Sequence, residues 1–149
     1  MKIVVASDHA GFERKGEILS YLIGEGFDVE DLGAHILEPD DDYPKYMVPA
    51  AMRVLNDPEN TRAIIFGMSG QGEAMVANRF PGVRATVWYG GSLDIVRLSR
   101  EHNDANVLSI GAHFVTKDEM IAAVKLWIST PFSGEERHAR RIEEIDAVE

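Results

Sequence analysis

Short apolar runs alternate along this chain with longer segments in which apolar residues recur at helical spacing. The apolar runs, rich in β-branched residues, predict strands at residues 2–6, 63–66, 83–88 and 105–110, and alternating apolar and polar residues predict a shorter strand at 27–32. Helical spacing predicts helices at residues 12–23, 44–55 and 117–128, helical segments after strands three and four, and a last helix from about residue 135. Buried strands that alternate with helices indicate a parallel sheet covered on both faces. We therefore predict an α/β fold, a doubly wound, Rossmann-like three-layer sandwich with a five-stranded parallel sheet and a C-terminal helix.

Composition narrows the class of protein. The 149 residues fit one compact domain, residues 1–149, and we find no internal repeat or linker. A net charge of -10 argues against nucleic-acid or membrane partners, which require a basic surface. Cysteine is absent, which excludes disulfides, thiolate metal sites and a cysteine nucleophile and fits a cytoplasmic protein. The apolar N-terminal run is too short for a signal peptide, and no run of 18 apolar residues occurs, so we expect a soluble, untargeted chain.

Residues 67–73, Gly-Met-Ser-Gly-Gln-Gly-Glu, join the third predicted strand to a helix. Their glycine spacing is not that of a dinucleotide fingerprint, and no Lys-Ser/Thr pair completes a P-loop. Backbone N–H groups of such a turn can hold a phosphate or a developing oxyanion. Glu73 could then accept and return a proton beside that oxyanion, as enolisation requires. The alternative is a plain helix-entry turn in which Glu73 is a favourable first-turn acid.

Polar residues also follow other strands of the predicted sheet. Asp8 and His9 follow strand one, and a Gly-Gly-Ser turn at residues 90–92 follows strand four. Ligands bind beyond the carboxyl ends of parallel strands, so we expect these segments to converge with the glycine-rich loop. Asp8 suits recognition of a substrate hydroxyl, and His9 suits contact with a phosphate or hydroxyl. The alternatives are that Asp8 caps the next helix and that His9 is an ordinary loop histidine.

Two further groups are candidates for chemistry. His102 lies in the polar stretch 100–106 and is a candidate acid/base, or otherwise a surface histidine at a helix end. Arg137 and Arg141 lie four residues apart and could clamp a phosphate dianion. Neighbouring glutamates could instead pair with both arginines on the helix surface. No metal-binding spacing of histidines or acids is present.

Five segments in this order resemble the ribose-5-phosphate isomerase type B family, which also includes galactose-6-phosphate isomerase subunits. They are residues 6–12, residues 42–44, residues 67–72 with 77–79, residues 100–106, and Arg137-His138 with Arg141. The resemblance implies interconversion of an aldose phosphate and a ketose phosphate through an enediolate, without metal or organic cofactor. Ribose 5-phosphate is the expected substrate.

The resemblance also implies roles for the candidate residues. Glu73 would be the base, His102 with Asp8 would open the furanose ring, and the backbone around Ser69 would stabilise the enediolate. Arg137 and Arg141 would hold the phosphate. The remaining residues expected to contact the substrate are His9, Tyr43, Gly67, Gly70, Gln71, Gly72, Asn103 and His138.

The sequence departs from the family pattern at two positions. Many members carry a cysteine base where this chain has Gly67, and a second branch places a glutamate where this chain has Glu73. His113 stands where a phosphate-binding arginine is frequent, which leaves a hexose 6-phosphate, allose or galactose, as an alternative substrate. Family members place parts of each site on two subunits, which implies a homodimer or tetramer. A noncatalytic nucleotide-binding regulatory domain is the alternative from another class.

Overall fold

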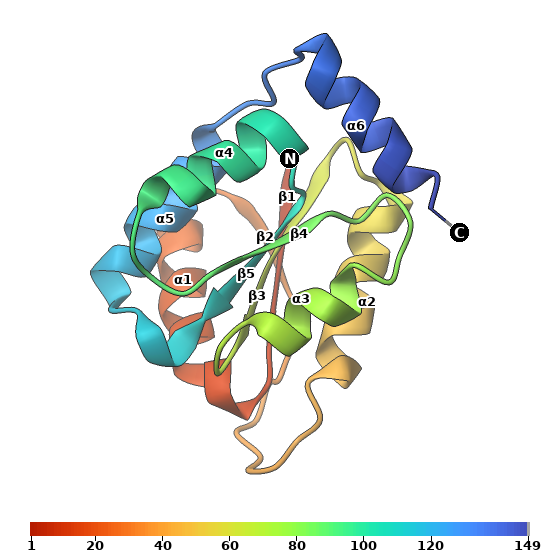
Figure 1. The fold of residues 1–149 in the computed structure, drawn as a ribbon. Coiled ribbons are helices and arrows are strands. Elements are labelled where there is room, and N and C mark those ends of the chain that lie inside the picture. Colours follow the sequence, from red (N-terminus) through yellow and green to blue (C-terminus); the bar gives the residue numbers. More distant parts are fainter. Residues whose placement is uncertain (149) are drawn as a thin grey trace.

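A computed structural model describes residues 1–148 and contains one five-stranded parallel sheet. The strands are β1 (Lys2–Ser7), β2 (Asp28–Asp31), β3 (Thr61–Gly67), β4 (Ala85–Trp88) and β5 (Val107–Gly111). Their order across the sheet is β2-β1-β3-β5-β4, so β4 is an edge strand although it precedes β5 in sequence (Figure 1). The predicted α/β sandwich with a five-stranded parallel sheet is confirmed.

Helices cover both faces of this sheet. They are α1 (Phe12–Gly24), α2 (Pro44–Asn56), α3 (Gln71–Ala77), α4 (Leu93–Asn103), α5 (Lys117–Ser129) and α6 (Glu136–Asp146), with short 3-10 turns η1 (His9–Gly11) and η2 (Ala112–Phe114). Figure 1 shows α1, α4 and α5 on one face and α2 and α3 on the other. Helix α6 lies near the end of the sheet at which the strands begin.

The strand residues divide between two apolar cores by simple alternation. Ile3 and Val5 face the cluster formed with α1 and α5, whereas Val4 and Ala6 face the cluster formed with α2. Successive side chains of a strand point to opposite faces, so a strand buried on both faces has to be apolar throughout. This explains why the central strands appear in the sequence as continuous apolar runs.

Strand boundaries differ from the predicted ones by at most two residues. Strand β5 begins at Val107, two residues later than predicted, because the side chain of Asn106 bonds the turn before β4. Its Oδ1 accepts from the N–H of Arg84 at 2.8 Å, and its Nδ2 donates to the carbonyl of Gly82 at 2.9 Å. Buried Ala105 therefore belongs to a loop whose apolar content is strand-like.

Candidate active site

The loop between β3 and α3 turns sharply at Gly70, whose backbone is left-handed at φ 78°. The Ser109 hydroxyl donates to the Gly70 carbonyl at 2.6 Å and ties this loop to β5. A Cβ atom at residue 70 would approach Ser109 Oγ to 3.1 Å, so both conformation and space favour glycine there. Within the loop, the Ser69 hydroxyl accepts a long hydrogen bond of 3.4 Å from the N–H of Gln71.

Glu73, in the first turn of α3, points its carboxylate back over the end of β3. A Cβ atom built on Gly67 would overlap that carboxylate, so Glu73 occupies the volume that a side chain at residue 67 would need. Glu73 is buried, with 5% exposure. Burial is the main cause that raises its pKa; a backbone hydrogen bond opposes the shift, and the nearby Asp8 charge adds to it. A carboxylate with a raised pKa suits proton transfer near neutral pH.

Asp8, which follows the end of β1, lies near Glu73. Its Oδ1 accepts from the N–H of Gly11 at 3.1 Å, which caps η1 as the alternative interpretation anticipated. A Cβ atom on Gly11 would overlap Phe66, so glycine lets η1 pack against the end of β3. Burial is the main cause that raises the pKa of Asp8 as well. Two buried carboxyl groups with raised pKa values in one place are typical of a functional site.

His9 is held by an aspartate that sequence reasoning did not single out. One carboxylate oxygen of Asp41, Oδ1, contacts both the backbone N–H of His9 at 2.9 Å and ring atom Nδ1 at 2.7 Å. The hydrogen bond to Asp41 is the main cause that raises the pKa of His9. Burial opposes ionisation of Asp41, but the hydrogen bonds from His9 and Tyr46 and the His9 charge together lower the Asp41 pKa. With Nδ1 engaged, Nε2 is the ring atom left for a ligand.

Tyr43 reaches the glycine-rich loop from the start of α2. A Cβ atom on Gly72 would lie 2.8 Å from the Tyr43 hydroxyl oxygen, so the phenol rests directly on the backbone of Gly72. The structure thus brings together one half of the candidate site, which we call the carboxylate cluster. Its members are Asp8, His9, Tyr43, Gly67, Ser69, Gly70, Gln71, Gly72 and Glu73, with Asp41 added by the structure.

The remaining predicted site residues form a second group, the histidine cluster, where α4 meets α6. The rings of His102 and His138 stack at 4.2 Å between centroids and 13° between planes. His138 is 4% exposed, and burial is the main cause that lowers its pKa. Arg137 pairs through Nε with Glu135 at 2.9 Å, one of the surface pairs that the alternative interpretation anticipated. Exposed Asn103 and Arg141 complete the cluster.

The two clusters lie at opposite ends of the sheet. The carboxylate cluster follows the strand ends of β1 and β3, whereas His102 closes α4 just before β5 begins. Figure 1 shows α6 and the end of α4 at the top, and the loops after β1, β2 and β3 at the bottom. One chain therefore does not bring His102, Arg137 or Arg141 to Glu73. The Gly-Gly-Ser turn at 90–92 follows edge strand β4, which β5 separates from β3, and the Ser92 side chain caps α4.

Among residues 1–148, one group of acidic and imidazole side chains lies close enough to share a metal ion. It comprises Asp8, His9 and Asp41, whose ligand atoms fall within 4.8 Å of one another. The short His9–Asp41 hydrogen bond accounts for this proximity without a metal. Across the same residues, no helix is both long and apolar enough to cross a membrane.

The sequence matches the family model described as Ribose/Galactose Isomerase over residues 3–145. The chain belongs to this family, and the resemblance in its motifs is confirmed. Ribose-5-phosphate isomerase B of Mycolicibacterium paratuberculosis is 41% identical over 144 residues, which are 96% of this chain and 88% of that protein.

Solved structures agree with the sequence relatives. Ribose 5-phosphate isomerase B from Thermotoga maritima has a TM-score of 0.91 and 38% identity, covering 99% of this chain and 98% of that chain. Ribose-5-phosphate isomerase B from Mycoplasma genitalium, solved with bound ribulose-5-phosphate, has a TM-score of 0.92 and 35% identity, covering 97% and 93% of the two chains.

Proposed function

We propose that this protein interconverts an aldose phosphate and a ketose phosphate without a metal or organic cofactor, with ribose 5-phosphate and ribulose 5-phosphate as the pair. The observation that carries the proposal is the buried Glu73 carboxylate, which fills the side-chain space above Gly67. In many family members a cysteine base occupies that position of the chain. Here the carboxylate lies in the same volume, so the proton-accepting group keeps its place although it comes from another residue.

In the proposed reaction Glu73 takes the proton from C2 of the open-chain aldose and returns it to C1. The raised pKa of Glu73 makes it a stronger base than an exposed carboxylate once it is ionised. N–H groups of the loop from Ser69 to Gly72 would stabilise the enediolate oxygens. Asp8 lies close enough for its charge to act on Glu73 and would bind a substrate hydroxyl.

Ring opening and phosphate binding require the histidine cluster. We assign ring opening to His102, and phosphate binding to Arg137 and Arg141. Because these residues lie at the far end of the sheet from Glu73 in one chain, the complete site requires a second copy of the protein. The assembly is then a homodimer or a tetramer, in which each site combines the carboxylate cluster of one chain with the histidine cluster of another. His9 would meet the phosphate through Nε2.

The test is ketose formation from a panel of aldose 5- and 6-phosphates in chelator-treated buffer. We expect turnover of ribose 5-phosphate, with solvent deuterium entering at C2 in the reverse reaction. Glu73→Gln keeps the size of the side chain but cannot accept a proton, so kcat should fall by about 10²–10⁴. A folded Gln variant with near-normal turnover would remove Glu73 from the mechanism, and a panel without any turnover would contradict the proposed function.

One observation favours the hexose phosphates as a second candidate. A cavity beside His9 is lined by Phe12, Leu37, Met68 and His113, and His113 replaces the arginine that is frequent in the family. A shorter side chain there leaves more room beside the phosphate end. Preference for allose or galactose 6-phosphate over ribose 5-phosphate in the same panel would support this substrate class.

A further inference from the structure

The guanidinium of Arg84 holds three separate parts of the chain. Arg84 directly precedes β4, and its side chain is 15% exposed. Its Nε donates to the carbonyl of Asn103 at 3.1 Å, and its Nη2 donates to the carbonyl and the Oδ2 of Asp104 at 3.2 and 3.1 Å. Its Nη1 donates to the carbonyl of Gly82 at 3.2 Å and to Asp146 Oδ2 at 3.1 Å. The partners are thus the loop before β4, the end of α4 and the last residue of α6.

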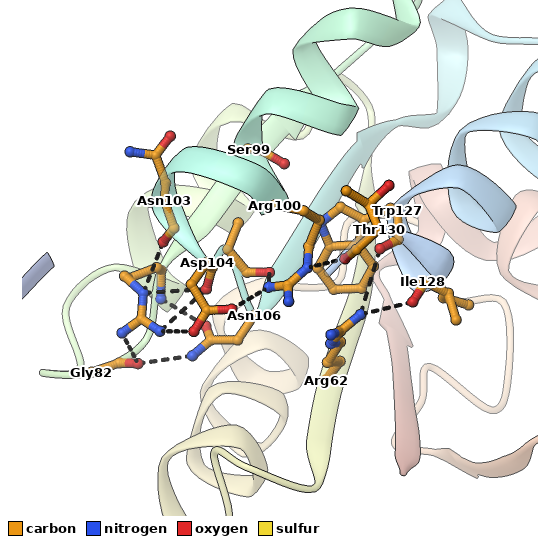
Figure 2. Close-up of polar contacts among 12 residues, drawn as sticks. Arg62, Gly82, Ser99, Arg100, Asn103, Asp104, Asn106, Trp127, Ile128 and Thr130 are labelled. Carbon is orange, nitrogen blue, oxygen red and sulfur yellow. Dashed lines mark hydrogen bonds and ion pairs between the residues drawn. The ribbon is translucent and has the colours of Figure 1, made fainter. Parts of the chain in front are cut away.

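Helix α4 ends in a turn whose backbone conformation is uncommon for residues other than glycine. Asp104 is left-handed at φ 44° and ψ 44°, a conformation uncommon outside glycine. Its two carboxylate oxygens are held by different arginines, Oδ1 by Arg100 at 2.8 Å and Oδ2 by Arg84. Figure 2 shows Asn103, Asp104 and Arg100 in one continuous set of polar contacts. Because His102 is two residues before Asp104, this turn sets the position of its ring.

Helix α6 is attached to the same turn at both of its ends. Near its start, His138 stacks on His102, and the N–H of Ser133 donates to the carbonyl of Glu101 at 3.1 Å. At its end, Asp146 pairs with Arg84. The helix is therefore oriented by contacts with the end of α4 and with Arg84.

We propose that Arg84 is a positioning residue that fixes His102 and the arginine-bearing helix α6 relative to each other through one side chain. This rests on the proposed function, in which His102 opens the ring and α6 binds the phosphate. Arg84 itself acts through the backbone of Asn103 and Asp104 and through Asp146. Ring opening and phosphate binding then both depend on Arg84, which lies far from Glu73 in the same chain.

The test compares Arg84→Met with Arg62→Met. Arg62 is a matched control because it is also half-buried and also donates to carbonyls at a helix end, those of Trp127 and Ile128 at 3.5 and 3.0 Å (Figure 2). Arg84→Met should lower kcat for ribose 5-phosphate by about tenfold to a hundredfold, since a displacement of about 1 Å can cost about 10²-fold. Arg62→Met should lower the melting temperature and leave kcat near the wild-type value.

A second readout separates ring opening from proton transfer. Ribulose 5-phosphate is an open-chain ketose, so deuterium uptake at its C1 requires Glu73 but no ring opening. Arg84→Met should slow this uptake less than it slows conversion of ribose 5-phosphate. Asp146→Ala breaks only the contact with α6, so it should raise KM and leave the ratio of the two rates unchanged. Equal loss of both rates in Arg84→Met would overturn the assignment.

A third readout does not depend on catalysis. In Arg84→Met, amide hydrogen exchange should become faster in residues 99–106 and 136–146, and the ring signals of His102 and His138 should shift in NMR spectra as their stack loosens. Neither change should occur in Arg62→Met. Unchanged exchange and ring signals in Arg84→Met would exclude a positioning role even if the wild-type protein turned over no sugar phosphate.

Discussion

At the residue scale, Glu73 combines its proposed catalytic role with a cost in stability. Its carboxylate is buried, and burial raises its pKa above the ordinary value of 4.5. The folded protein therefore holds a proton at Glu73 more tightly than the unfolded chain does. This contribution to stability is complete below about pH 4.5 and is lost as the pH rises through the folded-state pKa. At neutral pH the protein keeps a buried charge that the fold would be more stable without.

We therefore expect Glu73→Gln to be at least as stable as the wild type at pH 7, although it is nearly inactive. The stability difference should shrink as the pH falls toward 4.5, because both side chains are then neutral. Thermal unfolding of the variant and the wild type from pH 4.5 to 8 measures this stability difference. Glu13, an exposed first-turn acid of α1, supplies the control: Glu13→Gln should lose about 0.3–1 kcal/mol of helix-dipole stabilisation. Lower stability of Glu73→Gln at pH 7 would contradict the burial argument.

The Asp41–His9 pair gives the second prediction at this scale. The raised pKa of His9 depends mainly on its hydrogen bond to Asp41, so Asp41→Asn should lower that pKa in an NMR titration. The pH at which KM begins to rise should then be lower in Asp41→Asn than in the wild type. The increase should be smaller than the roughly tenfold effect of losing a direct charge-assisted contact. Asp42→Asn, at an exposed neighbour, is the control and should change neither quantity.

Asp41 also marks a limit of sequence reasoning. Glu73 and Asp8 were predictable because each follows an apolar strand, and parallel strands place such residues at one edge. Asp41 lies in a run of three aspartates in a proline-containing loop, where no periodicity distinguishes one acid from the next. Only the folded loop shows that the Asp41 carboxylate, and not those of its neighbours, accepts hydrogen bonds from His9.

At the element scale, the periodicity predicted which segments form helices and strands but not how strands are ordered. The chain crosses from β3 to β4 over a position that β5 later fills, and no apolar pattern encodes that choice. The Gly-Gly-Ser turn therefore follows an edge strand that is separated from β3 by β5. The motif-bearing loops after β1 and β3 were placed correctly because their strands are direct neighbours.

Helix α6 gives a prediction for its exposed arginines. Arg137→Ala or Arg141→Ala should raise KM about tenfold or more, because each would lose the proposed charge-assisted phosphate contact of roughly 1.5–3 kcal/mol. Arg140, one residue from Arg141 and close to Glu144, is the control on the same helix. Steady-state kinetics of the three variants measure the change in KM. If Arg140→Ala weakens binding as much as the others, a general charge effect replaces the phosphate clamp.

At the scale of the whole molecule, the separation of the two clusters predicts complementation between inactive variants. Glu73→Gln damages one cluster and His102→Asn the other, so a mixed dimer would contain one intact site and one doubly altered site. After denaturation and refolding together, random pairing should restore about a quarter of wild-type activity for a two-fold dimer. A mixture of Glu73→Gln with Asp8→Asn should restore none, because both changes fall in the same cluster. Failure of the first mixture would mean that sites are not shared.

The overlap between residue 67 and the Glu73 carboxylate also has an evolutionary consequence. In the observed conformation the Glu73 carboxylate occupies the volume of a side chain at 67, so any larger residue at 67 requires that carboxylate to turn away. If the carboxylate is to take the observed position, the side chain at 67 has to be lost before or together with the gain of glutamate at 73. Aligned relatives should therefore show the two positions as mutually exclusive, with glycine at 67 wherever glutamate stands at 73.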